Sequence, residues 1–224
     1  MTEAEWLACT YAAPLLEFLR GKASDRKFRL FAVACCRRLG EDRLSFYLET
    51  EQALLVAERF ADGLASEEER ASAAALAEQA VTAEVNAVGR AGTEMAVASA
   101  VASDIAAAAP AAASLALQAG HDHGLYRHDD MAEQGRRQVR LVREIFGNPF
   151  RPVTLDPAWL AWDGGTVAKL AQAIYDERAF DRLPVLADAL EEAGCDSEGL
   201  IQHCRAEGEH FRGCWAVDRL LGKG

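Results

Sequence analysis

Nine consecutive residues near the front of the chain, FRLFAVACC from Phe28 to Cys36, contain one polar side chain, Arg29. A helix built from them is apolar on almost every face, and such a helix must be surrounded by other elements. Ser24 precedes the run as an N-cap. We therefore predict that residues 24–39 form the most buried helix of the protein, at the centre of a bundle, with Cys35 inside.

The remaining sequence follows the same helical period of apolar residues. Predicted helices cover residues 3–20, with Pro14 as a break or second start, and residues 44–64, 130–147, 165–178, 183–193, 197–205 and 213–222. Strand-like alternation of useful length is not found in the sequence, and neither is a tetratricopeptide or ankyrin repeat period. The predicted fold class is all-α, an irregular multi-helix bundle.

Residues 66–130 form an alanine-rich segment. Ser66, followed by three glutamates, is typical of a helix start, because the helix dipole favours acids in the first turn. We expect breaks near Gly89–Gly92 and at Pro110, since proline lacks a backbone N–H. Alanine lets helices approach closely but supplies little hydrophobic energy. The segment is therefore predicted to be an Ala-rich helical hairpin inserted into the fold, and its softest part.

Part of this segment resembles a membrane span in composition, since residues 91–120 carry only Glu94 and Asp104 as charges. An aspartate near the middle of a span costs about 3 kcal/mol on insertion, and alanine offsets little of it. We predict a helix outside the membrane, and no membrane partner.

Residues 148–165, NPFRPVTLDPAWLAWDGG, contain three prolines and cannot form one long helix. Their aromatic and aliphatic residues are too apolar for a solvated linker. We predict an ordered, Pro-rich connection packed over the core. The chain is then a single helical domain, residues 1–224, whose core comes from 1–65 and 138–223 with 66–130 inserted.

The net charge of −11 would repel a phosphate backbone, so nucleic acid is not an expected partner. The N-terminus carries acids where a signal peptide requires a basic start. We therefore expect a cytoplasmic protein with reduced thiols.

Residues 195–214, in the C-terminal region, contain two of the five histidines and three of the six cysteines of the chain. The candidate metal ligands there are Cys195, His203, Cys204, His210 and Cys214. They include no CxxC pair, the spacing that makes zinc sites persuasive. His203 and Cys204, as helix neighbours, point about 100° apart and do not easily serve one ion.

Core packing is an alternative explanation for the cysteines of this region. Cys204 lies in an apolar stripe with Leu200 and Ile201, and Cys214 in another with Val217 and Leu221. Small buried residues are the commonest role of unoxidised cysteine. We predict that residues 213–222 form a terminal helix docked on the helix of Cys204, with no metal site favoured and zinc as the ion if one is bound. The Cys-Trp pair at 214–215 also resembles that of papain-like proteases, but no base follows it.

A second polar cluster lies in residues 121–130, HDHGLYRHDD. His121, His123 and His128 are candidate ligands, because the His-x-His spacing suits a transition metal in a flexible loop. Alternatively, residues 121–130 form a solvated loop that connects two helices. We expect this loop rather than a metal site.

Long motifs at both ends, among them EFLRGKASDRKFRLFAVACCRR, REIFGNPFRPVTLDPAWL, AFDRLPVLADALEEAGC and HFRGCWAVDRLLGK, resemble a large family of uncharacterised paralogous bacterial proteins of planctomycete type. The resemblance covers about residues 1–65 and 138–223. It implies no activity and no site residue.

Two functions remain open from the sequence. The first, which we favour, is a non-catalytic helical interaction or scaffold module with an unidentified protein partner. The second is a small metal- or thiol-dependent enzyme that uses the C-terminal cysteines and histidines. Catalytic residues and cofactor-binding residues are not assigned.

Overall fold

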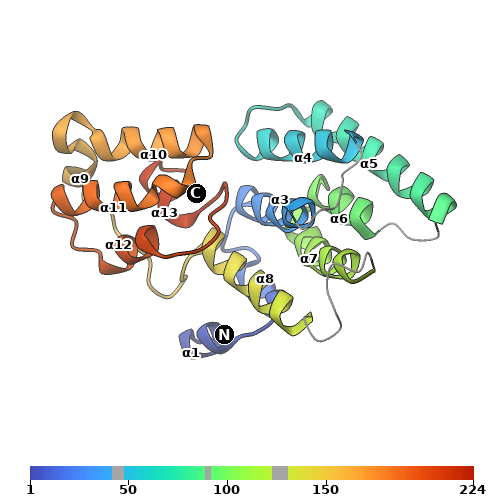
Figure 1. Cartoon of the computed structure of the whole chain (residues 1–224), viewed down its shortest axis with the longest axis horizontal. Coiled ribbons are helices and arrows are strands. Elements are labelled where there is room, and N and C mark those ends of the chain that lie inside the picture. Colours follow the sequence, from blue (N-terminus) through green and yellow to red (C-terminus); the bar gives the residue numbers. More distant parts are fainter. Residues whose placement is uncertain (42–47, 89–91, 123–130) are drawn as a thin grey trace. The chain divides into compact units, whose positions relative to one another are not determined.

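The computed structural model describes residues 1–41, 48–88, 92–122 and 131–224, and within them all regular structure is helical (Figure 1). The all-α class is therefore confirmed. The helices are α1 (Glu3–Ala8), α2 (Ala12–Leu19), α3 (Asp25–Glu41), α4 (Leu48–Ala61), α5 (Glu67–Val88), α6 (Gly92–Ala100), α7 (Ile105–Asp122), α8 (Met131–Phe146), α9 (Pro157–Ala161), α10 (Thr166–Glu177), α11 (Leu183–Glu192), α12 (Glu198–Arg205) and α13 (Trp215–Leu220), with 3-10 turns η2 (Trp162–Gly164) and η3 (Phe180–Arg182).

The chain divides into two compact units, which we call the N-terminal unit (residues 1–142) and the C-terminal unit (residues 143–224). This division differs from the expected single domain with residues 66–130 inserted, because the Ala-rich helices share one unit with residues 1–65. Packing between residues 1–65 and 138–223 stays a prediction. Helix α8 begins in the N-terminal unit, and its last turn belongs to the C-terminal unit.

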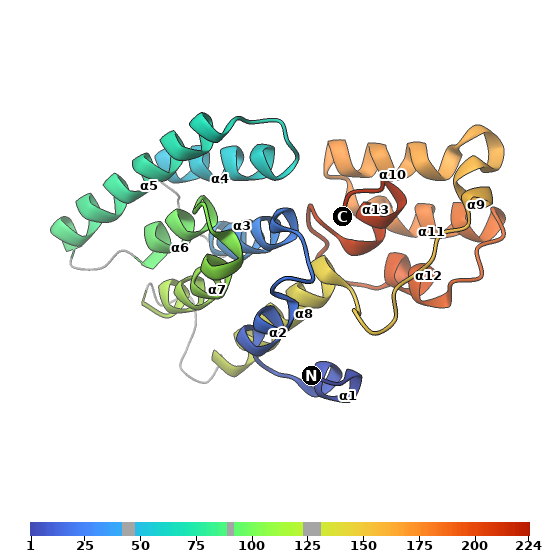
Figure 2. The ribbon, with the colours of Figure 1, turned by 180° about the vertical axis from the view of Figure 1, so that it is seen from behind.

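Helix α3 is the centre of the N-terminal unit, as its apolar run predicts. Every residue from Phe28 to Cys36 is buried, and α4, α6 and α7 pack around the helix (Figure 2). The one polar residue of the run, Arg29, donates from Nη1 to the carbonyl oxygen of Ala100 at 2.9 Å, at the end of α6. A buried guanidinium is tolerated there because it bonds a helix C-terminal carbonyl.

The Ala-rich helices are part of this core rather than an appended hairpin. Both α6 and α7 pack on α3, and a Cβ added at Gly92 would lie 3.2 Å from Ala119 on α7. Small side chains allow this close approach. The break expected at Pro110 is wrong: Pro110 lies inside α7, which begins after Asp104 accepts a hydrogen bond from the backbone N–H of Ala107 at 3.1 Å.

The C-terminal unit has its own core, built from α9 to α13 and the Pro-rich connection before them. Helix α10 packs with α9, α11 and α13 (Figure 1). The connection is ordered, as predicted: Trp159 is buried, and Val153, Leu155, Leu160 and Trp162 pack against the same core. The four predicted short helices correspond to α10, α11, α12 and α13, although α13 is shorter than expected.

Some predictions fall on residues 42–47, 89–91 and 123–130, which lie outside the described part of the chain. They include the start of the predicted helix 44–64, part of the break near Gly89–Gly92, and the loop with His123 and His128. The backbone of His121 lies in the last turn of α7. Among the described residues, no helix has both the length and the apolar character needed to cross a membrane.

Candidate metal centre

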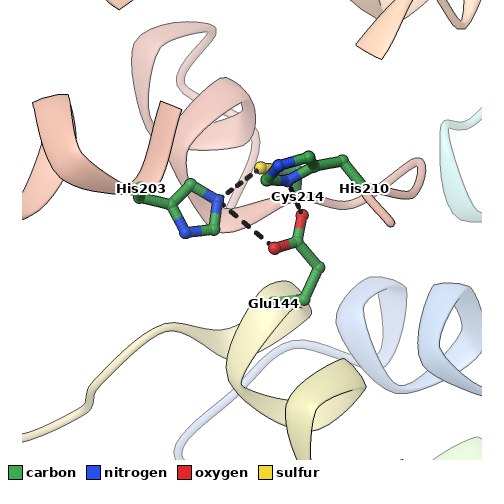
Figure 3. A group of neighbouring side chains, drawn as sticks. All are labelled: Glu144, His203, His210 and Cys214. Carbon is green, nitrogen blue, oxygen red and sulfur yellow. Dashed lines mark hydrogen bonds and ion pairs between the residues drawn. The ribbon is translucent and has the colours of Figure 1, made fainter. Parts of the chain in front are cut away.

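Four potential metal ligands from three segments of the C-terminal unit converge on one point (Figure 3). They are Glu144, His203, His210 and Cys214, and each offers one ligand atom within 4.8 Å of all the others. Glu144 and Cys214 are buried, and the two histidine side chains are only 15% and 8% exposed. Three of the four, all but Glu144, belong to the C-terminal candidates taken from the sequence.

Glu144 lies in the last turn of α8, on the face that carries the buried residues Leu141 and Ile145. The helix ends at Gly147, whose φ of +71° is the left-handed conformation that suits glycine at a helix C-terminus. A Cβ at Gly147 would also lie 3.1 Å from the ring of Trp215. Gly147 therefore both ends the helix and leaves room for the residue that follows Cys214.

His203 comes from α12, whose Leu200 and Cys204 point into the core. Because neighbouring residues on a helix point about 100° apart, His203 faces away from that core and toward the group. Cys204 therefore lies outside the group, as its neighbour position predicted. Cys195 is also outside it, buried in the same core as Cys204.

His210 and Cys214 lie on the segment that joins α12 to α13. His210 is oriented by a contact of 3.4 Å from Nε2 to the carbonyl oxygen of Ala206. Cys214 is the residue before α13, and the φ of +97° at Gly213 allows the tight turn that brings the thiol inward. Cys214 and Val217, which share an apolar stripe in the sequence, are both buried.

The carboxylate of Glu144 lies between the two imidazoles. Its Oε1 is 2.9 Å from Nδ1 of His210, and its Oε2 is 3.3 Å from Nε2 of His203. The same Nε2 is 3.1 Å from Sγ of Cys214. Metal–ligand bonds of zinc put neighbouring ligand atoms of a tetrahedral site about 3.3–3.7 Å apart. The four side chains therefore need only small movements to surround one ion.

Burial and mutual contact shift the pKa values of these groups. Burial alone would raise the pKa of Glu144. The hydrogen bond with His210 and the charges of both histidines outweigh burial and bring this pKa below its ordinary value. Burial lowers the pKa of His203. Burial also acts to lower the pKa of His210, but the hydrogen bond and charge of Glu144 outweigh it and the pKa is raised. Burial and then the Glu144 carboxylate raise the pKa of Cys214 well above its ordinary value.

Fold and site together define a helical protein with a buried carboxylate, two imidazoles and a thiol in contact with one another. Comparison with protein-family models, with curated proteins and with solved structures finds no match in any of the three.

Proposed function

We propose that the chain is a non-catalytic helical module whose C-terminal unit is held together by a transition-metal ion, with zinc as the expected ion. One observation carries the proposal, the convergence of Glu144, His203, His210 and Cys214 within 4.8 Å. One thiolate, two imidazoles and a carboxylate are a ligand set that suits zinc, iron or cobalt. Calcium and magnesium, which prefer oxygen ligands, are not expected.

A structural role is supported by the number of ligands. Four protein side chains occupy all four coordination positions of a tetrahedral ion and leave none for water or substrate. This is the arrangement of structural zinc sites. The ligands also come from three segments, α8, α12 and the residues before α13. An ion there would join the two ends of the C-terminal unit, because Glu144 is near its start and Cys214 near its end.

The thiol-enzyme alternative receives less support from the same geometry. A catalytic cysteine needs a lowered pKa, whereas burial and the Glu144 carboxylate raise the pKa of Cys214. A bound metal ion would reverse this, since coordination deprotonates a thiol outright. The raised pKa therefore argues against a metal-independent nucleophile and leaves the metal-ligand role open.

The decisive experiment is elemental analysis of protein purified without a His-tag. We expect about one equivalent of zinc per chain, because tight structural sites retain their ion. Cys214→Ala should lose this metal. The matched control is Cys204→Ala, which also removes a fully buried thiol of the same core but one outside the group. Less than about a tenth of an equivalent in the wild type, or equal loss in both variants, contradicts the proposal.

The wider role that we propose is interaction with a protein partner inside a reducing compartment such as the cytoplasm, where Cys214 is not oxidised. Membership of the planctomycete-type family is proposed on the quoted motifs. Two of these motifs contain ligands, REIFGNPFRP with Glu144 and HFRGCWAVDRLLGK with His210 and Cys214. An alignment of chains that share the motifs tests the proposal, since ligand types should persist at all four positions.

A further inference from the structure

The indole of Trp215 contacts the group from outside it. Its Nε1–H donates to Nδ1 of His203 at 3.0 Å, and the two rings lie 4.9 Å apart. An indole nitrogen can only donate. Nδ1 of His203 must therefore accept, so neutral His203 carries its proton on Nε2, the nitrogen that faces Glu144 and Cys214.

This tautomer cannot bind a metal ion through Nε2, because that nitrogen has no lone pair available. For Nε2 to coordinate an ion, neutral His203 must move its proton to Nδ1. The proton would then point at the N–H of Trp215, and two donors would face each other. Coordination by His203 therefore requires the hydrogen bond from Trp215 to break.

His210 lies differently, with an acceptor at each ring nitrogen. Its Nδ1 is 2.9 Å from Oε1 of Glu144, and its Nε2 is 3.4 Å from the carbonyl oxygen of Ala206. An ion bound to Nδ1 would take the place of the proton between Nδ1 and Glu144, while Nε2 would keep its proton and donate to Ala206. Metal-binding histidines usually donate their second N–H to a carbonyl or carboxylate in this way. Coordination through Nδ1 of His210 therefore keeps the outer hydrogen bond of that ring, whereas coordination through Nε2 of His203 breaks one.

We propose that Trp215 is the residue that sets the metal affinity of this site, by holding His203 in the tautomer that does not coordinate. The inference rests on the proposed metal site. It makes Trp215 a positioning residue that weakens binding: the ion must displace the indole N–H before the fourth ligand can join. Removing this N–H should therefore tighten binding instead of weakening it.

Trp215→Phe tests the inference, because phenylalanine keeps an aromatic ring and lacks the donor. Zinc affinity is measured at one fixed pH by competition with a chromophoric chelator, on the full chain. We expect the dissociation constant to fall about fivefold, the equivalent of one neutral hydrogen bond. His203→Gln and the double variant complete a cycle, and with glutamine at 203 the change at 215 should have no effect. Unchanged or weaker binding in Trp215→Phe, or an equal gain in both backgrounds, overturns the inference.

A spectroscopic measurement on the wild type covers the case in which Trp215→Phe does not fold. ¹⁵N NMR of the imidazoles reports which nitrogen carries the proton. Metal-free protein should show an unprotonated Nδ1 at His203, and addition of zinc should protonate Nδ1 and shift the indole N–H signal of Trp215. A structural role of Trp215 in packing alone would not move this proton. If zinc binds and Nδ1 stays unprotonated, the inference fails while the metal site stands; if no zinc binds, the proposed function itself fails.

Discussion

Cys9 and Cys35 show how differently thiols are placed in the N-terminal unit. Cys9 follows α1 and is partly buried, whereas Cys35 is buried in the centre of α3. Burial raises the pKa of Cys35 to about 12. Because the thiolate is the reactive form, Cys35 is protected twice, by lack of access and by protonation.

We therefore predict that a thiol reagent labels native protein rapidly at Cys9 and not at Cys35. Raising the pH from about 7 to about 9 should leave Cys35 unlabelled, since its pKa lies far above this range. Peptide mass mapping after a short pulse measures both sites, and labelling in denaturant gives the full signal for each. Rapid labelling of Cys35 in the native protein would place it outside the core.

Three members of the candidate group were among the five C-terminal residues named from the sequence, although core packing was favoured there over a metal site. The fourth member, Glu144, was missed for a physical reason. His203, His210 and Cys214 lie within a short segment, so their closeness can be read directly from the sequence. Glu144 lies roughly 70 residues earlier, and only tertiary packing brings it to them. The one available signal is its position on α8, between the buried residues Leu141 and Ile145, where an unpaired acid would be costly.

At the scale of elements, the C-terminus of α6 is held by two arginines from other helices. Arg29 of α3 donates to the carbonyl of Ala100, and Arg70 of α5 donates to the carbonyl of Val101. Both guanidiniums also lie over the ring of Phe60. Cations at a helix C-terminus bond the carbonyls that have no partner within the helix.

Arg29→Met should lower the free energy of unfolding by about 1.5–3 kcal/mol, because a buried charge-assisted hydrogen bond is lost and the carbonyl of Ala100 is left without it. Urea unfolding measures the change. The control is Arg59→Met: Arg59 also donates to a carbonyl, that of Leu64 at 2.8 Å, but its side chain is 50% exposed. Its loss should cost less than about 1 kcal/mol. Equal effects of the two changes on the free energy of unfolding would mean that the burial of Arg29 adds nothing to the stability that its hydrogen bond provides.

Helix α7 contains Pro110 in its second turn, where proline cannot donate to the carbonyl of Ala106. We predict that Pro110→Ala raises the free energy of unfolding by about 1–3 kcal/mol, since alanine restores the N–H and has the better helix propensity. The control is Pro157→Ala, at the first position of α9, where proline is well tolerated. That change should be neutral or slightly destabilising. A loss of stability in Pro110→Ala would show that the proline fits its neighbours better than alanine does.

The break expected at Pro110 shows where local sequence patterns failed to predict this fold. Proline at 110 suggested an end, but Asp104 caps α7 six residues earlier and the helix continues through the proline. Packing of the Ala-rich helices on α3 stabilises α7, and this tertiary stabilisation cannot be read from local helix propensity. By contrast, the sequence from Phe28 to Cys36 correctly indicated a buried helix. A helix that is apolar on almost every face must be surrounded by other elements.

At the scale of the whole molecule, the two units should respond differently to metal removal. A strong chelator should increase amide hydrogen exchange in residues 143–224, because binding of an ion to the folded form stabilises it by mass action. Exchange in residues 25–36 and 105–119 should stay unchanged. The same chelator added to Cys214→Ala should have no effect. Increased exchange across both units would mean that the ion stabilises more than the C-terminal unit.

The order of the ligands along the chain has a consequence for biosynthesis. At about 5–20 residues per second, a ribosome adds Glu144 some 4–14 s before Cys214. During this interval the N-terminal unit has all of its helices available and can fold, while the carboxylate at the end of α8 stays hydrated. The buried group can form only after the segment with His210 and Cys214 has emerged. Dehydration of the Glu144 carboxylate is therefore expected only after this segment has emerged, and the proposed ion would bind at that step.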